Sequence, residues 1–476
     1  MAKPAQPSRP LTHAVVIGGS VAGLLAARVL TEHYDRVTVL EKDLLRDDDQ
    51  PRKGVPQGRH VHAMLIRGQR IIERLFPGFS EWMISNGALT PNMGQDAAWH
   101  VFGSWRPRYT SELAALAASR PLLERGIRRF ALATPGITFR GGCSLTGLLT
   151  DEAQGAARGV RFKEEGAGKD ALEQTLHADL VVDASGRGSR MPKLLEALGC
   201  PVPEETVVPS GAAYATRVFK LADRPRAWTF CYVQPTPGNG TRGAIIAPIE
   251  GGKHIATLIG MAGDHPPTTE EGFMAFAESL PTAEIATALR EATPCSPIYG
   301  FARAENRRRA YEALPRHLEG LLVLGDANMA LNPVYGQGMT AAAIGAETLD
   351  AVLRDATGPE GVGVPGLARA FQRALSGALA VPWQMATGED RRWPGYGDGA
   401  TPGLGARLIN RFMDHFQRGT LRSPQLTEAF YRVAQMVDGP TSLFAPRVLW
   451  HLLTSRFRAP QPALPVSPEA RALRAA

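Results

Sequence analysis

Residues 321–340, reading LLVLGDANMALNPVYGQGMT, combine groups that suit a ligand with hydroxyls and a negative charge. The first four residues have the apolar composition of a buried strand, and Asp326 follows them, where a carboxylate can accept a hydrogen bond from a ligand hydroxyl. Pro333, Gly336 and Gly338 then lead into an alanine-rich helical stretch, and such a turn presents free N–H groups and the positive end of a helix dipole. These features suit a flavin, with its polyol chain and anionic reduced ring; an ordinary strand–loop–helix of an α/β enzyme is the alternative.

The N-terminal segment 13–41 has the pattern of a dinucleotide-binding β–α–β unit. A short apolar strand leads into the glycine loop GGSVAG, a helical run follows, and a second strand ends at Glu41. In this pattern Gly18 makes the tight turn, Gly23 allows the helix and strand to pack closely, and Glu41 can bind both ribose hydroxyls. Ser20 stands where the middle glycine is usual, and its small hydroxyl can donate to a phosphate.

A third strand edge lies in the middle of the chain, where residues 178–190 read ADLVVDASGRGSR. The strand ends at Asp183, and a turn rich in glycine and serine follows. The glycine loop alone does not separate FAD from NAD, but three such strand edges favour a large dinucleotide lying across one sheet.

In order and spacing, these segments resemble the FAD-dependent monooxygenases of the para-hydroxybenzoate hydroxylase fold, over about His13 to Trp393. The resemblance implies that the first glycine loop and Glu41 bind the ADP half of FAD and that Asp326 holds the ribityl chain. The Asp183–Ser189 segment is implied to serve FAD and NADPH or NADH, although it reads DASGRGS where the aromatic hydroxylases have D-G-x-x-S.

Further stretches extend this resemblance. Arg52–Leu65 looks like the region that runs close to the flavin ring, and Ser119–Glu124 resembles the helix start whose arginine, here Arg120, contacts the cofactor. The sequence of Asn332–Met339 is similar to that of the family branch that includes epoxidases of bacterial polyether biosynthesis. Because a guanidinium matches phosphate geometry, Arg59 and Arg120 are candidates for pyrophosphate or ring contact.

The roles expected of the site residues follow from this resemblance. The loop from Pro333 places N–H groups against the ring's developing charge, and His60 or His62 acts as a proton shuttle, unless both only bind the backbone. Tyr335 faces the substrate or packs. The candidate catalytic residues are His60, Tyr335, Gly336 and Gln337. The candidate cofactor-binding residues are Gly18, Ser20, Gly23, Glu41, Arg59, Arg120, Asp183, Asp326, Pro333, Gly336, Gly338 and Met339.

The expected substrate is largely apolar. The predicted substrate-domain strands carry mostly apolar and aromatic side chains and no dense basic constellation, which favours a polyketide, terpenoid or polycyclic aromatic: Tyr214, Val218, Phe230, Tyr232, Ile245 and Ile259. The resemblance implies insertion of one atom of O2, by epoxidation or hydroxylation, through a flavin hydroperoxide. NADPH or NADH supplies electrons, directly or through a flavin reductase. A reductase acting on a prenyl-type chain and a hydroxylase of a small phenol are the alternatives. Halogenation is disfavoured because no Trp-x-Trp-x-Ile-Pro sequence occurs.

Composition excludes several other classes. The 476 residues carry a net charge of +7, but the basic residues are scattered, so no nucleic-acid footprint is indicated. No apolar run is long enough to span a membrane. The four cysteines form no C-x-x-C pair, which argues against a metal site and favours a cytoplasmic location.

The expected fold is α/β: a Rossmann-like FAD-binding domain of the glutathione reductase type, an antiparallel substrate domain and a C-terminal helical region. The FAD-binding domain is expected to be discontinuous, over residues 11–80, 112–205 and 302–385, with a β-meander built from 137–139, 159–163 and 175–178. Residues 81–111 and 206–301 form the substrate domain, and 386–476 the helical region. Its last helix, over 442–457, is expected to pack its apolar stripe on the catalytic body; a basic amphipathic helix lying on a membrane is the alternative.

Overall fold

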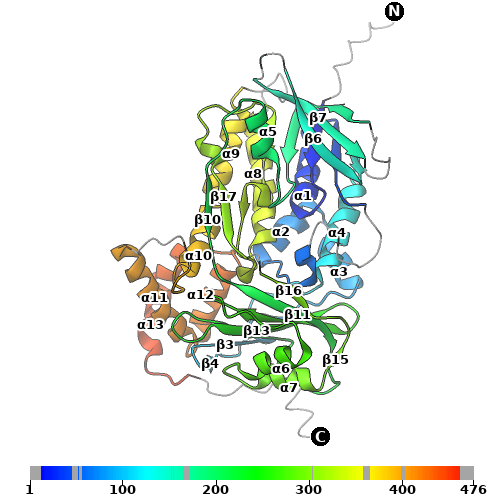
Figure 1. Cartoon of the computed structure of the whole chain (residues 1–476). Coiled ribbons are helices and arrows are strands. Elements are labelled where there is room, and N and C mark those ends of the chain that lie inside the picture. The colour runs from blue at the N-terminus through cyan, green and yellow to red at the C-terminus, as the bar shows by residue number, and fades with distance from the viewer. Residues whose placement is uncertain are drawn as a thin grey trace, which may run out of the picture.

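The computed structural model describes residues 12–44, 52, 56–151, 153, 155–164, 172–302, 304–356, 365–397 and 403–460 (Figure 1). In these residues a parallel sheet lies at one end of the molecule and a large antiparallel sheet at the other, with the C-terminal helices beside the latter (Figure 1). The expected mixed α/β fold is confirmed, and the predicted domain boundaries stay predictions.

The parallel sheet gathers strands from distant parts of the chain in the order β18–β9–β1–β2–β5. All its neighbouring strands pair in parallel, so their carboxyl ends meet at one edge, with Ile17 opposite both Leu40 and Asp183. The glycine loop, Glu41, Asp183 and Asp326 all follow this edge. The strands are β1 His13–Ile17, β2 Arg36–Leu40, β5 Ile137–Arg140, β9 Leu180–Asp183 and β18 Leu321–Val323.

Helices cover one face of this sheet, and α1 packs directly on α8. A small antiparallel meander covers the other face, where Val160 and Phe162 pack against Val15 and Val181. The helices of this half are α1 Val21–Leu30, α2 Ile66–Leu75, α3 Phe79–Ser85, α4 Arg120–Leu132, α5 Met191–Ala197, α8 Gly338–Ala356 and α9 Leu367–Ala378. The meander strands are β6 Cys143–Thr150, β7 Ala157–Glu164 and β8 Gln174–His177.

One strand assignment from the sequence was wrong. Residues 137–139 were expected in the meander, but β5 joins the parallel sheet beside β2, and β6 takes its place in the meander. The physical reason is that α4 comes directly before β5, which makes β2–α4–β5 a crossover to a parallel strand.

The antiparallel sheet has the order β15–β11–β14–β13–β12–β3–β4, with β16 also pairing with β11. Within it, β12 and β3 pair in parallel, in contrast to the other neighbours. Successive side chains along its strands point to opposite faces of the sheet. On β13, Ala244 and Ile246 pack in a core with α6 and α7, whereas Ile245 and Ala247 lie on the other face. The strands are β3 Ala97–Val101, β4 Ser104–Trp105, β11 Ala213–Lys220, β12 Phe230–Val233, β13 Arg242–Ile249, β14 Lys253–Gly260, β15 Thr293–Pro294 and β16 Tyr299–Phe301; the helices are α6 Glu270–Glu278 and α7 Glu284–Arg290.

A small three-stranded sheet connects the two halves. It consists of β10 Glu205–Val208, β17 Asn306–Arg309 and β19 Met329–Ala330. The strand β19 leads directly into the Asn332–Met339 loop, so this sheet fixes where that loop emerges between the parallel and antiparallel sheets.

The C-terminal helices are α10 Ala380–Asp390, α11 Leu404–Thr420, α12 Pro424–Ala434 and α13 Pro446–Ser455. The last helix is shorter than expected, because Pro446 starts it and a separate 3-10 turn covers 440–444. Leu452 packs against Phe416 and Leu426, whereas Trp450 and Leu453 are exposed, so only part of the apolar surface of α13 is covered. Among the residues described, no helix is long and apolar enough to cross a membrane.

Candidate active site

The first glycine loop has the tight geometry expected of a dinucleotide-binding turn. Gly18 has a φ of +102°, and a Cβ there would lie 2.5 Å from the carbonyl oxygen of Ala184, just after β9. A Cβ on Gly23 would lie 1.8 Å from the carbonyl oxygen of Gly18. Both positions therefore require glycine, and the bare backbone leaves the start of α1 open to a ligand.

A cluster of charged side chains surrounds this loop. Glu41 is buried and accepts a hydrogen bond from the Gly19 N–H at 2.7 Å. The Ser20 hydroxyl donates to Glu124 at 2.7 Å and accepts from Arg120 at 3.2 Å, so Arg120 and Glu124 meet at the loop. The sequence reasoning did not single out Arg52 or Glu124. Arg52 lies between Glu41 and Glu124, at 3.2 and 2.8 Å.

The electrostatics of this cluster hold Glu124 as a carboxylate. Burial opposes its ionisation, but Arg120, Arg52 and the Ser20 hydrogen bond outweigh burial and lower the pKa of Glu124 to about 2. Its i,i+4 spacing from Arg120 is a local pattern from which the pairing could have been predicted. Arg52 has no such local pattern, because it lies far in sequence from both of its partners.

Asp183 lies at the expected strand edge, but its oxygens are occupied by its own turn. It accepts hydrogen bonds from the Ser185 N–H and hydroxyl at 3.0 and 2.6 Å, and from the Ser189 hydroxyl at 2.5 Å. Burial raises the pKa of Asp183, while these bonds lower it. Asp183 therefore shapes the turn that touches Gly18.

Asp326, by contrast, has unused acceptors. It lies in a 3-10 turn after β18, partly exposed, and among the described residues no group donates a hydrogen bond to its carboxylate. Burial raises its pKa, and the charges of Arg187 and Arg120 lower it, so this carboxyl faces the same region as the glycine loop. A free carboxylate at this edge suits a ligand hydroxyl.

The Asn332–Met339 loop leads into α8 with bare backbone and unpaired polar atoms. Gly336 has a φ of +66°, and a Cβ on Gly338 would meet nothing within 4 Å. The Oε1 of Gln337 and the hydroxyl of Thr340 are buried and have no hydrogen-bond partner among the described residues. The Met339 side chain is buried in the core, so only its main chain can serve a ligand.

A buried polar network supports the Asn332–Met339 loop on the side away from the cavity. The sequence analysis did not identify its central residue, Asp390. Asp390 at the end of α10 accepts hydrogen bonds from the Tyr335 hydroxyl at 2.6 Å, from the Asn332 amide at 3.0 Å and from the Asn306 amide. Burial raises the pKa of Asp390 to about 6, against the lowering effect of these bonds. The Tyr335 hydroxyl thus binds Asp390, while its ring borders the cavity described next.

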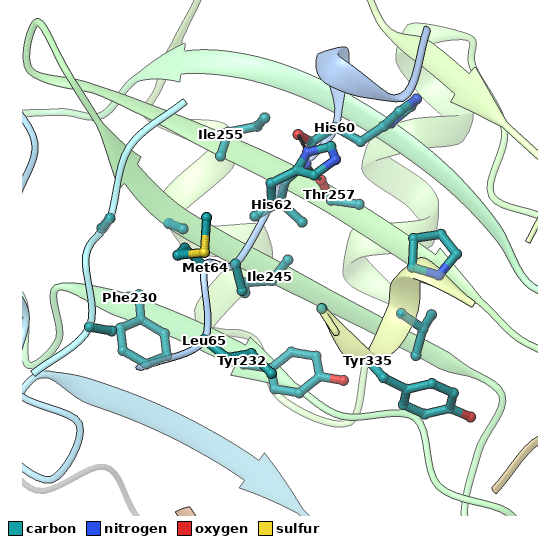
Figure 2. Close-up of a pocket in the computed structure, with 18 of the residues that line it drawn as sticks. His60, His62, Met64, Leu65, Phe230, Tyr232, Ile245, Ile255, Thr257 and Tyr335 are labelled. Carbon is teal, nitrogen blue, oxygen red and sulfur yellow. Dashed lines mark hydrogen bonds between the residues drawn. The ribbon is translucent and has the colours of Figure 1, made fainter. Parts of the chain in front are cut away.

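An apolar cavity of about 230 Å³ lies between the loop and the antiparallel sheet. Figure 2 shows Phe230, Tyr232, Ile245 and Ile255 of the sheet around the same space as Met64, with Tyr335 at one side. Of the six apolar and aromatic side chains singled out on the substrate-domain strands, five line this cavity, and Val218 does not. Those that do are Tyr214, Phe230, Tyr232, Ile245 and Ile259.

His60 and His62 both line the cavity, while Arg59 does not. His60 is largely buried, and burial followed by the charge of Arg59 lowers its pKa to about 4. For His62, burial and then the charge of Arg120 lower the pKa to about 3. Both imidazoles are therefore neutral at pH 7. The Arg59 guanidinium lies over the ring of Tyr299, 4.7 Å from its centre, and its predicted cofactor contact stays a prediction.

These residues fit FAD: bare backbone at Gly18 and Gly23, a free acceptor at Asp326, and unpaired polar atoms at the start of α8 beside an apolar cavity. Within the described ranges, no group of His, Cys, Asp and Glu could hold a metal ion. Fold and site together define a flavoenzyme with an FAD-binding domain.

A comparison with known protein families agrees with an FAD-binding fold. Residues 11–356 match the family described as FAD binding domain, and the chain belongs to that family. The chain is 35% identical over 358 residues to Protein Rv3254 of Mycobacterium tuberculosis, an alignment that covers 72% of this chain and 73% of that protein.

Solved structures show the same fold at low sequence identity. A triple mutant of the flavin-dependent brominase Bmp2 aligns with a TM-score of 0.64 at 15% identity, over 93% of this chain and 99% of the brominase. PqsL of Pseudomonas aeruginosa, solved with 2-aminobenzoylacetate, aligns with a TM-score of 0.56 at 18% identity, over 80% of this chain and 98% of PqsL. The expected fold, that of para-hydroxybenzoate hydroxylase, is therefore confirmed.

Proposed function

We propose that this protein is an FAD-dependent monooxygenase that inserts one oxygen atom from O2, by epoxidation or hydroxylation, into a largely apolar natural product. The observation that carries the proposal is the apolar cavity bordered by Pro333, Val334 and Gly336, the loop that leads into α8. Among the described residues that line it, none is an Asp, Glu, Lys or Arg. This lining suits a polyketide, terpenoid or polycyclic aromatic substrate.

FAD, when bound, would supply the chemistry that activates O2. The chain's own residues would bind and orient the cofactor and the substrate and would exclude water. Asp326 would accept hydrogen bonds from ribityl hydroxyls, and the start of α8 would offer N–H groups to negative charge. Gln337 would use its buried, unpaired Oε1 toward the cofactor. The apolar walls would keep water from the reacting atoms.

Electrons would come from NADPH or NADH, directly or through a flavin reductase. The Asp183 carboxylate accepts hydrogen bonds from serines of its own turn, and Arg187 donates to Glu305 and Leu331. The backbone of the turn is therefore the group that would contact a nicotinamide nucleotide. Anaerobic mixing of the FAD-loaded protein with NADPH or NADH separates the two routes: rapid bleaching of the flavin supports direct reduction, and bleaching only after a reductase is added supports the partner.

The proposed reaction has two rivals on the same fold. A reductase of a prenyl-type chain would also suit an apolar cavity. A hydroxylase of a small phenol is disfavoured for carboxylated phenols, because no cation lines the described part of the cavity. Mass spectrometry after incubation with polyene and polycyclic aromatic substrates decides: a product heavier by one oxygen atom supports the monooxygenase, and a product that gains only hydrogen contradicts it.

A further inference from the structure

A chain of three buried polar side chains interrupts the apolar wall of the cavity. His60 Nδ1 lies 2.8 Å from the hydroxyl oxygen of Thr216, which lies 2.8 Å from the hydroxyl oxygen of Thr257. The N–H of Val61 donates to that Thr257 oxygen over a long 3.4 Å. Thr216 on β11 and Thr257 on β14 are opposite each other in the sheet, so the fold itself brings these groups together.

The hydrogen atoms of this chain can be placed by requiring every buried hydroxyl to have a partner. The Thr257 oxygen accepts a hydrogen bond from the Val61 N–H, so the Thr257 hydroxyl proton is available to donate to the Thr216 oxygen. Thr216 then donates to His60 Nδ1. The reverse order would leave the Thr257 proton without a partner among the described residues, although Thr257 is almost fully buried. The favoured arrangement makes Nδ1 an acceptor and puts the ring proton on Nε2.

The Nε2 of His60 is therefore a neutral donor. Among the described residues nothing hydrogen-bonds to it, and the ring borders the cavity (Figure 2). The burial that lowers the pKa of His60 keeps the imidazole uncharged at pH 7. A neutral N–H donor in an apolar wall selects a ligand with an acceptor oxygen, and it gives no net charge to attract an anion.

We propose that the cavity binds an uncharged apolar substrate through one acceptor oxygen, such as a ketone, ester or ether oxygen, held by His60 Nε2–H. The Thr216–Thr257 pair sets the tautomer of His60, so these threonines are positioning residues. This inference rests on the proposed function only in taking the cavity as the substrate site.

The test uses three bicyclic probes of one ring system: naphthalene, 2-acetylnaphthalene and 2-naphthoate. Binding to the FAD-loaded protein is followed by the fluorescence of Trp99, which lines the cavity, with Trp99→Phe used to assign the change. The ketone is expected to bind about fivefold more tightly than naphthalene, the effect of one neutral hydrogen bond, and the carboxylate more weakly than either.

Variants at His60 distinguish a hydrogen bond from His60 Nε2–H from purely apolar binding in the cavity. His60→Phe should bring the ratio of ketone to naphthalene affinity close to one, and His60→Gln, which restores an N–H donor, should recover part of it. The matched control is Ile255→Ala, another lining residue on β14, which should weaken both probes equally.

Three results would overturn the inference: no preference for the ketone in the wild type, an equal loss for ketone and naphthalene in His60→Phe, or tightest binding of the carboxylate. Because binding is measured without turnover, a normal ketone preference in a protein that never transfers oxygen would refute the proposed function and leave this inference standing.

Discussion

Asp390→Leu tests the network that holds the Asn332–Tyr335 loop. The substitution removes the acceptor of three donors, from Tyr335, Asn332 and Asn306. Each buried donor left unpaired costs about 2 kcal/mol, so the loss is about 6 kcal/mol. Burial has raised the pKa of this carboxyl from its ordinary 3.8 to about 6, so removing it restores about 3 kcal/mol of stability. The expected net destabilisation at pH 7 is about 3 kcal/mol.

The assay is urea unfolding of wild type and variant, with Asp414→Leu as the matched control. Asp414 makes an ion pair with Arg392 and is more than one-third exposed, so its loss should cost no more than about 1 kcal/mol. FAD retention should also fall in Asp390→Leu, because the loop that leads into α8 loses its support. Equal stability of the two variants would refute the reasoning.

The pH dependence has a definite sign. The pKa of Asp390 is higher in the folded protein than in the unfolded chain, so its contribution to stability is present below the unfolded pKa and lost as pH rises through about 6. The deficit of Asp390→Leu relative to wild type should therefore grow as pH falls from 7 toward 4. A deficit that stays constant over this range would show that Asp390 does not titrate there.

Three other substitutions test separate parts of the protein, two at the cofactor site and one, Arg106→Met, at the contact with α11. Asp326→Ala should weaken FAD binding about tenfold by fluorescence titration, through loss of a charged acceptor, and unchanged affinity would contradict the ribityl contact. Gly23→Ala should give protein without FAD, because the new Cβ would lie 1.8 Å from the Gly18 oxygen; a fully yellow, equally stable variant would disprove this. Arg106→Met should cost about 2 kcal/mol in urea unfolding, because Arg106 is fully buried and donates to Thr420 and Gln417; a neutral effect would contradict that role.

The ends of the apolar strands predicted where several candidate cofactor-binding residues lie in the fold. Gly18, Glu41, Asp183 and Asp326 all lie at the carboxyl edge of the parallel sheet, because each follows an apolar run whose type can be read locally. The close approach of Gly23 to the Gly18 oxygen similarly lies within one β–α–β unit. These features depend on neighbours in sequence, which is why a single sequence carries them.

The missing parts are contacts between distant segments. Asp390 lies 55 residues beyond Tyr335 in a helix with no local sign of a role, and Thr216 and Thr257 meet only because β11 pairs with β14. The misplaced strand at 137–139 had the same origin, since its pairing partner is decided by the preceding crossover helix. One local contact was also missed: Asp183 uses its oxygens on Ser185 and Ser189 of its own turn.

The central claim, oxygen transfer from O2 to an apolar substrate, is tested most directly with isotopically labelled dioxygen. The FAD-loaded protein is supplied with NADPH or NADH, a flavin reductase and an apolar polyene or polycyclic aromatic, and the product is analysed by mass spectrometry. The predicted product carries one labelled oxygen atom. A product that gains two hydrogens, or whose oxygen comes from water, would contradict the account.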